Sequence, residues 1–353
     1  MNKTVRIILI IAGALMVCGG IFITIGGLFG GSLRYGFTFG NPPVQYTELN
    51  CVNKSIEIAD FSSLYVDTAS VDVEIVNGDE PMLEVYAPEE FFPEVSQDGK
   101  SLSIHQPSLN WQFGVMVKGG EPYYRITVPT SDVLPTDVTT ASGNLRISGV
   151  NIEGNVSTTS GEIMIEDVTS DDLEIQTTSG NGELSNFTLS NFKYFSTSGD
   201  VSMNNINTPE LEYSSTSGIL NASNCKIDYF SIQSTSGDCF LEDLTTQKIE
   251  TDTTSGNITL NNIKTGSLSS ISSSGDINAD KFEVENILIN VSSSNINLLM
   301  NGDENDYDYI IDTQSGNIDI GSISTDHKYH SVDNKQNVIQ IDTTSGDINL
   351  SFQ

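Results

Sequence analysis

Apolar and polar residues alternate along most of this 353-residue chain, and a short polar tripeptide interrupts the alternation at an almost constant interval. The tripeptide is Ser-Gly-(Asp/Asn), and its glycines are separated by one step of 18 residues and then six steps of 19. A short, regular period of this kind is typical of a solenoid, in which one supersecondary unit stacks on the next. The glycines that define it are Gly143, Gly161, Gly180, Gly199, Gly218, Gly237, Gly256 and Gly275.

Aligning the repeats on this glycine reveals apolar columns. Residues two and four positions after it are apolar, as in Ile258 and Leu260, which predicts a strand with one buried face. Another apolar column lies seven positions after it, and turn-forming residues such as Asn186 precede that column, which indicates a bend. Apolar pairs twelve and fourteen positions after the glycine predict a second strand. The chain is therefore predicted to be all-β, a parallel β-helix or β-solenoid with about 19 residues per coil.

Serine precedes the glycine of each repeat, and we interpret the pair as a structural corner. Stacked serine hydroxyls are expected to hydrogen-bond along the column and to turn amides, while glycine supplies a backbone conformation with positive φ. The expected corner residues are Ser142, Gly143, Ser160, Gly161, Ser179, Gly180, Ser198, Gly199, Ser217, Gly218, Ser236, Gly237, Ser255, Gly256, Ser274, Gly275, Ser315, Gly316, Ser345 and Gly346.

The residue after the glycine is usually Asp or Asn, so a calcium ladder has to be considered. Neighbouring coils about 4.8 Å apart would hold adjacent carboxylates at a repelling distance, and no two carboxylates are neighbours in this column. A bridging cation would need carboxylates close together. The column therefore favours turn chemistry, and no cofactor is expected beyond loosely bound calcium.

The amino terminus predicts a membrane anchor. No charged residue occurs from Ile7 to Gly30, and this span is long enough to cross a bilayer as one transmembrane helix. Because Lys3 and Arg6 precede it, the positive-inside rule predicts a cytoplasmic tail at residues 1–6 and an extracellular carboxy-terminal domain. A cleavable signal and a lipoprotein signal at Cys18 are the alternatives. The length of the apolar run favours an uncleaved, single-pass anchor in the cell membrane.

The rest of the chain divides by composition and by the regularity of the repeat. Residues 31–55 predict a stalk because they are rich in Gly, Pro and aromatic residues. Residues 56–138 predict irregular early coils and a cap, since the end of a solenoid must be covered. Residues 139–353 predict the regular solenoid, with loop inserts at 301–308 and 324–337 where the period breaks.

Charge and side-chain chemistry narrow the range of functions that the sequence allows. The chain has 15 Lys and Arg against 47 Asp and Glu, a formal net charge of −32, so no nucleic-acid partner is expected. The basic residues lie at differing repeat offsets and form no cluster, and we expect no catalytic or cofactor-binding residues and no enzyme activity. Asp326, His327 and His330 in the second insert are the candidates for a metal site, but a solvated loop is the preferred interpretation.

The Thr-Ser-Gly-(Asp/Asn)-Ile coil, together with the segment Ala69–Ile75, resembles the bacterial "putative adhesin" family, which has a domain of unknown function. The resemblance extends from about Ile56 to Phe352. It implies a β-solenoid, often behind a transmembrane segment and sometimes associated with envelope-stress systems. It implies no catalytic residues.

Three functional hypotheses follow. The first is a membrane-anchored extracellular binding or adhesion-like module at the cell envelope, with a cell-wall polymer or another envelope protein as partner. The second is a scaffold or sensor in an envelope-stress system that acts through a membrane-protein partner. The third, a carbohydrate-active enzyme, is least favoured because carboxylates do not gather with Lys or Arg.

Overall fold

The computed structural model describes residues 47–107, 115–118, 120–129 and 132–353. This part of the chain is β-structure apart from turns and two short 3₁₀ helices, η1 (Glu89–Phe91) and η2 (Glu304–Asp306), so the all-β prediction is confirmed. The predicted tail at 1–6, the anchor at 7–30 and most of the stalk lie outside the described residues. Within the described ranges, no helix has the length and apolar character needed to cross a bilayer.

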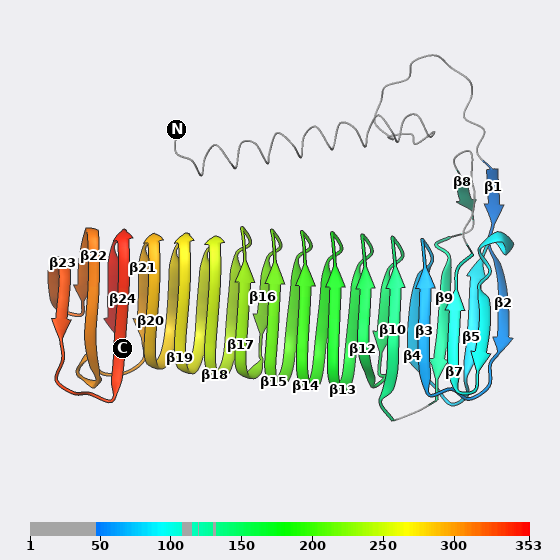
Figure 1. Ribbon diagram of the computed structural model, residues 1–353, viewed down its shortest axis with the longest axis horizontal. Coiled ribbons are helices and arrows are strands. Elements are labelled where there is room, and N and C mark those ends of the chain that lie inside the picture. Colours follow the sequence, from blue (N-terminus) through cyan, green and yellow to red (C-terminus); the bar gives the residue numbers. More distant parts are fainter. Residues whose placement is uncertain (1–46, 108–114, 119, 130–131) are drawn as a thin grey trace, which may run out of the picture. The chain divides into compact units, whose positions relative to one another are not determined.

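The chain forms two compact units. The first comprises Met1–Cys51 and Ser108–Gly120, and its described part contains a two-stranded parallel sheet of β1 (Thr47–Asn50) and β8 (Val115–Lys118). The second comprises Val52–Pro107 and Glu121–Gln353 and is an elongated stack of coils (Figure 1).

The middle of the stack is the predicted parallel β-solenoid. Most coils here are a single bent strand that pairs in parallel with the next coil, so that Phe192 lies beside Leu211 and Ile258 beside Ile277. The bent strands are β13 (Ile163–Thr177), β14 (Gly182–Ser196), β15 (Val201–Ser215), β18 (Cys239–Ser255), β19 (Ile258–Ser274) and β20 (Ile277–Ser293). The divided coils consist of β11 (Leu145–Ser148) and β12 (Ile152–Thr158), and of β16 (Leu220–Ser223) and β17 (Lys226–Ser234).

The apolar columns form the core along the axis of the stack. Tyr194 stacks on Tyr213 of the next coil, with ring centroids 6.0 Å apart, and both side chains are fully buried. The small residue Gly182 makes room for this column, because a Cβ there would lie 2.6 Å from the Tyr194 hydroxyl. A glycine at position 182 thus accommodates the large Tyr194 side chain in the core.

The predicted bend is confirmed, and its chemistry explains why Asx residues recur there. Asp167, Asn186, Asn205, Asn224, Asp243 and Asn262 all adopt left-handed backbone conformations, with φ between 52° and 60°. Asx residues tolerate this conformation better than most side chains do. Their side chains also bond between coils: Asn186 Nδ2 donates to Asp167 Oδ1 (2.8 Å), and Asn205 Nδ2 donates to Asn186 Oδ1 (2.9 Å).

The amino-terminal end of the stack departs from sequence order. Strands β3 (Ser63–Thr68) and β4 (Asp72–Asn77) pair with β10 (Leu134–Thr140) and β11 on one side. On their other side they pair with β7 (Ser101–His105) and β9 (Tyr123–Val128), although these strands come later in the chain than β4. The earliest coil is therefore inserted between two later ones.

Antiparallel strands close this end. Strand β5 (Met82–Ala87) pairs antiparallel with β9, β2 (Val52–Glu57) pairs with β5, and β6 (Glu94–Asp98) pairs with β7. Residues 52–55, predicted to end the stalk, instead lie in strand β2. The stalk prediction failed there because ladder hydrogen bonds to β5 decide the structure of a polar segment that has no apolar pattern.

At the carboxy-terminal end, too, the order of the coils departs from the order of the sequence. Strands β24 (Asn337–Ser345) and β25 (Ile348–Phe352) lie between the coil of β20 and β21 (Ile296–Met300) and the coil of β22 (Tyr307–Ile320). Strand β23 (Ile323–Ser331) then pairs antiparallel with β22 (Figure 1). The insert predicted as a loop at 324–337 is thus mostly a strand, because the free edge of β22 offers it backbone partners. The insert at 301–308 contains η2 and the start of β22.

Candidate functional site

The repeated corners join the strands of successive coils, and the hydroxyl that stabilises each one differs from the expected serine. The N–H of Gly143 donates to Thr140 Oγ1 (3.0 Å), and the N–H of Gly199 donates to Ser196 Oγ (3.0 Å). The acceptor is thus the buried Thr or Ser three residues before the glycine. The serine directly before the glycine is exposed at every corner named above.

Most of the corner glycines are also required for a reason other than the predicted positive φ. Among the predicted corner glycines, only Gly275, Gly316 and Gly346 have positive φ. The other corners require glycine because coils approach closely: a Cβ on Gly199 would lie 1.8 Å from the carbonyl oxygen of Gly180. Positive φ was the wrong general reason, since sequence does not reveal how near the neighbouring backbone lies.

The Asx column after the glycine is occupied by internal hydrogen bonds. Asn257 Oδ1 accepts from the N–H of Asp276 (2.9 Å), and Asp276 Oδ1 accepts from the N–H of Asn295 (2.8 Å). The same contact recurs with Asn181 and Asp200 as acceptors. Each carboxylate or amide thereby positions the next coil, which accounts for the column through turn chemistry.

The three candidate metal ligands all lie on β23, but they do not form a site. Among the described residues, no group of three or more His, Cys, Asp or Glu side chains is arranged to hold a metal ion. His330 Nε2 instead contacts Asp312 Oδ2 at 2.7 Å, and Lys328 Nζ lies 3.2 Å from Asp312 Oδ1. Burial favours a higher pKa for Asp312, but the hydrogen bonds from His330 and Lys328 outweigh it and lower the pKa below its ordinary value. His327 occupies a left-handed conformation, with φ at 67°.

The two inserts meet at the carboxy-terminal end. The Asp308 carboxylate, 5% exposed, accepts the N–H groups of Asp333 (2.7 Å) and Lys335 (3.0 Å). A small cavity of about 90 Å³ lies beside this contact, between Tyr307, Tyr309 and residues of the second insert. Asp308 therefore ties the connection that leads into β24 to the start of β22.

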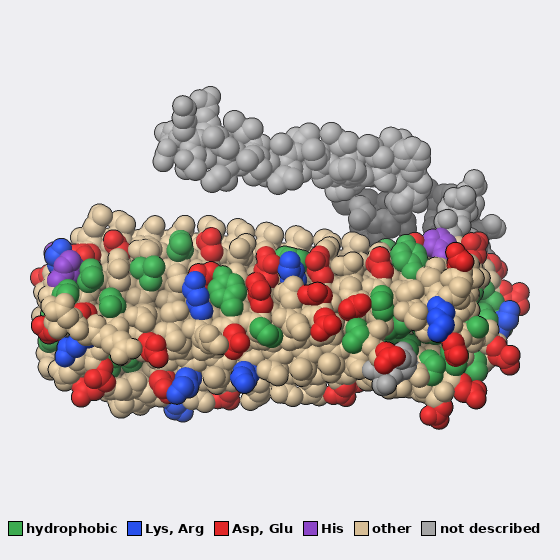
Figure 2. All heavy atoms as spheres, turned by 60° about the horizontal axis from the view of Figure 1, so that its bottom comes forward, with side chains coloured by type: hydrophobic (Ala, Val, Ile, Leu, Met, Phe, Trp, Pro, Cys, Tyr) green, Lys and Arg blue, Asp and Glu red, His purple; other side chains and the backbone are tan. Residues whose placement is uncertain are grey.

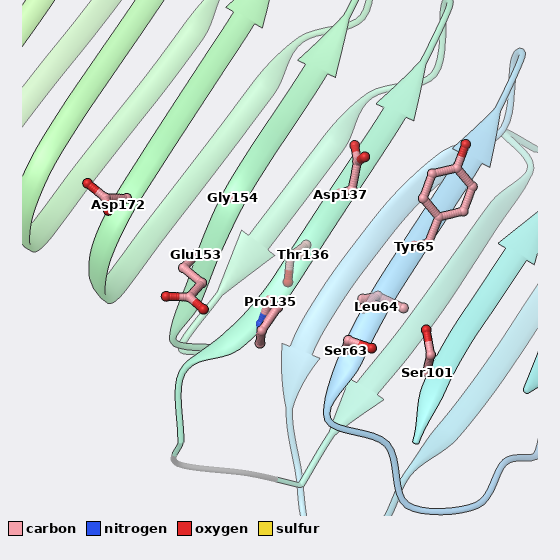
Figure 3. Close-up of a pocket in the computed structure, with 10 residues that line it drawn as sticks. All are labelled: Ser63, Leu64, Tyr65, Ser101, Pro135, Thr136, Asp137, Glu153, Gly154 and Asp172. Atoms are coloured by element: carbon pink, nitrogen blue, oxygen red, sulfur yellow. The ribbon is translucent and has the colours of Figure 1, made fainter. Parts of the chain in front are cut away.

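A larger hollow lies on the outer surface near the amino-terminal end, where β3, β7, β10, β12 and β13 run side by side. Its volume is about 480 Å³, and we call it the groove. Figure 3 shows the side chains that line it, contributed by successive strands of one sheet. The lining residues are Ser63, Leu64, Tyr65, Ser101, Pro135, Thr136, Asp137, Glu153, Gly154 and Asp172.

The groove coincides with a local break in the inward-facing column. Gly154 pairs with Leu173 of the next coil, and that position is occupied by Phe192 and Leu211 in the following coils. Gly154 has φ of 116°, and a Cβ there would lie 2.4 Å from the carbonyl oxygen of Thr136. The close approach of β12 to β10 therefore excludes any larger side chain at this point.

The polar part of the groove is acidic, and its aromatic part is exposed. The lining includes the carboxylates of Asp137, Glu153 and Asp172 and contains no Lys or Arg. The Tyr65 side chain is 43% exposed and is the register partner of Asp137 across the β3–β10 pair. The arrangement can accept hydrogen bonds, stack on a flat ligand face and attract positive charge.

None of these groove residues was predicted from the sequence. The available signal was the single step of 18 residues between Gly143 and Gly161, together with the aligned positions of Pro135 and Gly154 in otherwise apolar or strand-forming columns. This signal shows an irregular coil. It does not show that the irregularity faces an exposed tyrosine from a strand 72 residues earlier, since Tyr65 pairs with Asp137.

The chain is similar to several solved structures at low sequence identity. No protein with a curated description matches it. Similar solved structures include a "putative adhesin" from Parabacteroides merdae (15% identity, 72% of this chain and 96% of that chain, TM-score 0.47) and another from Parabacteroides distasonis (15% identity, 71% and 97%, TM-score 0.46). A "putative lipid binding protein" from Parabacteroides distasonis is also similar (17% identity, 72% and 99%, TM-score 0.38).

The sequence profile of one family matches almost the whole coil-forming region. Residues 61–212 and 188–351 each match the profile described as Toastrack DUF4097, and together they cover most of the chain. This agrees with the resemblance noted from the Thr-Ser-Gly-(Asp/Asn) repeat. The chain belongs to the Toastrack DUF4097 family.

Proposed function

We propose that this protein is a membrane-anchored module that binds a component of the cell envelope outside the cell. The observation that carries the proposal is the groove, an open hollow with an exposed tyrosine, two serines and three carboxylates on a rigid stack of paired strands. Binding sites of this kind combine an apolar surface with a few convergent polar groups. Reversible binding needs no nucleophile or metal in addition.

The predicted anchor at residues 7–30 supports the envelope location. A single apolar span preceded by Lys3 and Arg6 directs the remainder of the chain outward, and the net charge of −32 keeps a large exposed domain soluble. The acidic surface also disfavours nucleic acid and anionic lipid head groups as partners. A cell-wall polymer is the partner that this combination favours.

The test uses the full chain purified in detergent and incubated with two fractions of its own source organism, insoluble cell wall and solubilised membrane proteins. We expect retention by the wall fraction that survives a chelator of divalent cations. An unrelated acidic membrane protein in the same detergent is the control. Retention by membrane proteins alone would replace the proposal with a scaffold or sensor. Cleavage of a wall polysaccharide, abolished by one carboxylate substitution, would make the protein an enzyme.

A further inference from the structure

The carboxylates of the groove lack the cationic partners that some acidic residues of the stack have. Along the same face, Lys193 lies 3.9 Å from Glu212, and Lys248 contacts Glu250. Asp137, Glu153 and Asp172 form no ion pair with any described Lys, Arg or His. Lys100, which directly precedes β7, does not line the groove.

The distribution of charge around the groove strengthens this contrast. Strands β3, β7, β10 and β12 contain no Lys or Arg, and the one His among them, His105, already contacts Asp67 at 3.0 Å. Figure 2 shows that acidic side chains outnumber basic ones along the visible face. Carboxylates on adjacent strands about 4.8 Å apart repel one another, and a bound cation would relieve that repulsion.

The strands around the groove exclude one common way of binding a peptide. Strand β3 is paired with β7 and β10, β10 with β3 and β12, and β12 with β10 and β13. A peptide therefore has no free strand edge here on which to add itself as a further strand. The ligand must be recognised by side chains alone.

The remaining side chains suit a hydroxylated ring. The exposed face of Tyr65 offers an apolar platform for the flat C–H face of a sugar and also attracts an ammonium group by cation–π interaction. Ser63 and Ser101 lie at the edge of the same hollow and can exchange hydrogen bonds with sugar hydroxyls (Figure 3). Asp137 lies beside Tyr65, and Glu153 and Asp172 lie on the next two strands, beyond Pro135 (Figure 3).

We infer that the groove binds an amino-sugar oligosaccharide, with one ring against Tyr65 and its protonated amine at the Asp137 carboxylate, and with the amine of a neighbouring unit at the carboxylates of Glu153 and Asp172 on the next two strands. This inference rests on the proposed function, because it names the chemical class of the envelope component. Acetylation of the amine removes the charge that the carboxylates recognise, so a neutral N-acetylated sugar is a poor ligand.

The experiment compares glucosamine tetrasaccharide with N-acetylglucosamine tetrasaccharide, using the full chain in detergent at low ionic strength. We expect only the glucosamine tetrasaccharide to bind. Glu153→Gln with Asp172→Asn, and separately Tyr65→Ser, should each weaken binding about tenfold. Asp252→Asn removes an exposed carboxylate from the same face several coils away and should leave the affinity unchanged.

Each alternative outcome is decisive. Equal binding of both tetrasaccharides, or no binding of either, overturns the inference. An equal loss in the Asp252→Asn variant would show general attraction by the acidic surface, and tighter binding of tetralysine that is insensitive to Tyr65→Ser would show a peptide-type cation instead. If wall retention persists while glucosamine tetrasaccharide fails to bind, the proposed function stands and only the ligand class is wrong; loss of both rejects both.

Discussion

Neighbouring coils in the middle of the stack are also neighbours in the sequence, whereas the coils at both ends are not. Between β13 and β20, each coil lies beside the coils that precede and follow it in the chain. At the amino-terminal end β3 and β4 lie between two later coils, and at the carboxy-terminal end β24 and β25 lie between two earlier ones. Pairing in the middle joins coils that are adjacent in the sequence, whereas pairing at each end joins strands that lie farther apart in the chain.

The middle and the ends of the stack also differ in what covers the edges of their strands. A middle coil is covered on both sides by nearly identical coils, so its polar corners and apolar columns continue without interruption. At the ends, antiparallel strands β2, β6 and β23 replace the next coil. These strands carry mostly exposed side chains, and they limit further strand addition from solution.

The largest effect is expected from removing the inserted coil. A chain that ends at Gln336 lacks β24, which pairs with β20 and β22, and β25, which pairs with β21 and β22. Amides of β22 and β23 should lose at least about 3 kcal/mol of hydrogen-exchange protection, because local stability depends on neighbouring coils. Amides of β13 to β18 in the same sample serve as the control and should keep their protection. Unchanged protection of β22 would contradict the inverted order.

A smaller effect is expected from replacing single glycines by alanine. Two such variants distinguish close approach of the neighbouring backbone from positive φ as the reason for glycine. Gly199→Ala places a Cβ against the Gly180 carbonyl in the middle of the stack and should destabilise the protein by about 3 kcal/mol or more. Gly99→Ala at the amino-terminal end meets no atom within 4 Å, and its positive φ alone should cost about 1 kcal/mol. Urea denaturation followed by circular dichroism measures both. Equal costs would mean that backbone approach is not the constraint in the middle coils.

The smallest effect concerns the covered edge at the carboxy-terminal end. Because the pKa of Asp312 is lowered in the folded state, its contacts with His330 and Lys328 stabilise β23 above the ordinary carboxyl pKa. That contribution disappears as the pH falls through the lowered value. The side chains are partly exposed, so the loss should stay below about 1 kcal/mol.

Hydrogen exchange of β23 can isolate this contribution. The difference in protection between the wild type and Asp312→Asn should be present at neutral pH and vanish in acid. Asp326→Asn, a change within β23 itself, should show no such difference. A pH-independent difference for Asp312→Asn would assign its effect to packing and not to charge.

Much of the middle could be predicted because the repeat supplies redundant information. The apolar columns that include Ile258 and Leu260 recur in several coils, and so do Asx residues such as Asn186. A pattern that repeats in this way predicts structure more reliably than the same pattern in one coil. The ends could not be predicted in the same way. Residues 324–337 have no repeat pattern, and only the available edge of β22 turns most of them into a strand. The groove could not be predicted from the sequence for a related reason. Tyr65 and Asp137 become neighbours only because β3 pairs with β10, which follows it much later in the chain.

From its sequence alone, this protein is an all-β solenoid with a 19-residue coil, an acidic surface and a predicted membrane anchor, because periodicity, charge and hydrophobicity are properties of the chain itself. Only the tertiary structure decided which coils are neighbours, since strands with the same apolar columns are compatible with more than one partner. It also decided why the corners need glycine and where Tyr65 meets unpaired carboxylates. Both depend on the distance to a neighbouring coil, and a pattern within one coil does not contain that distance.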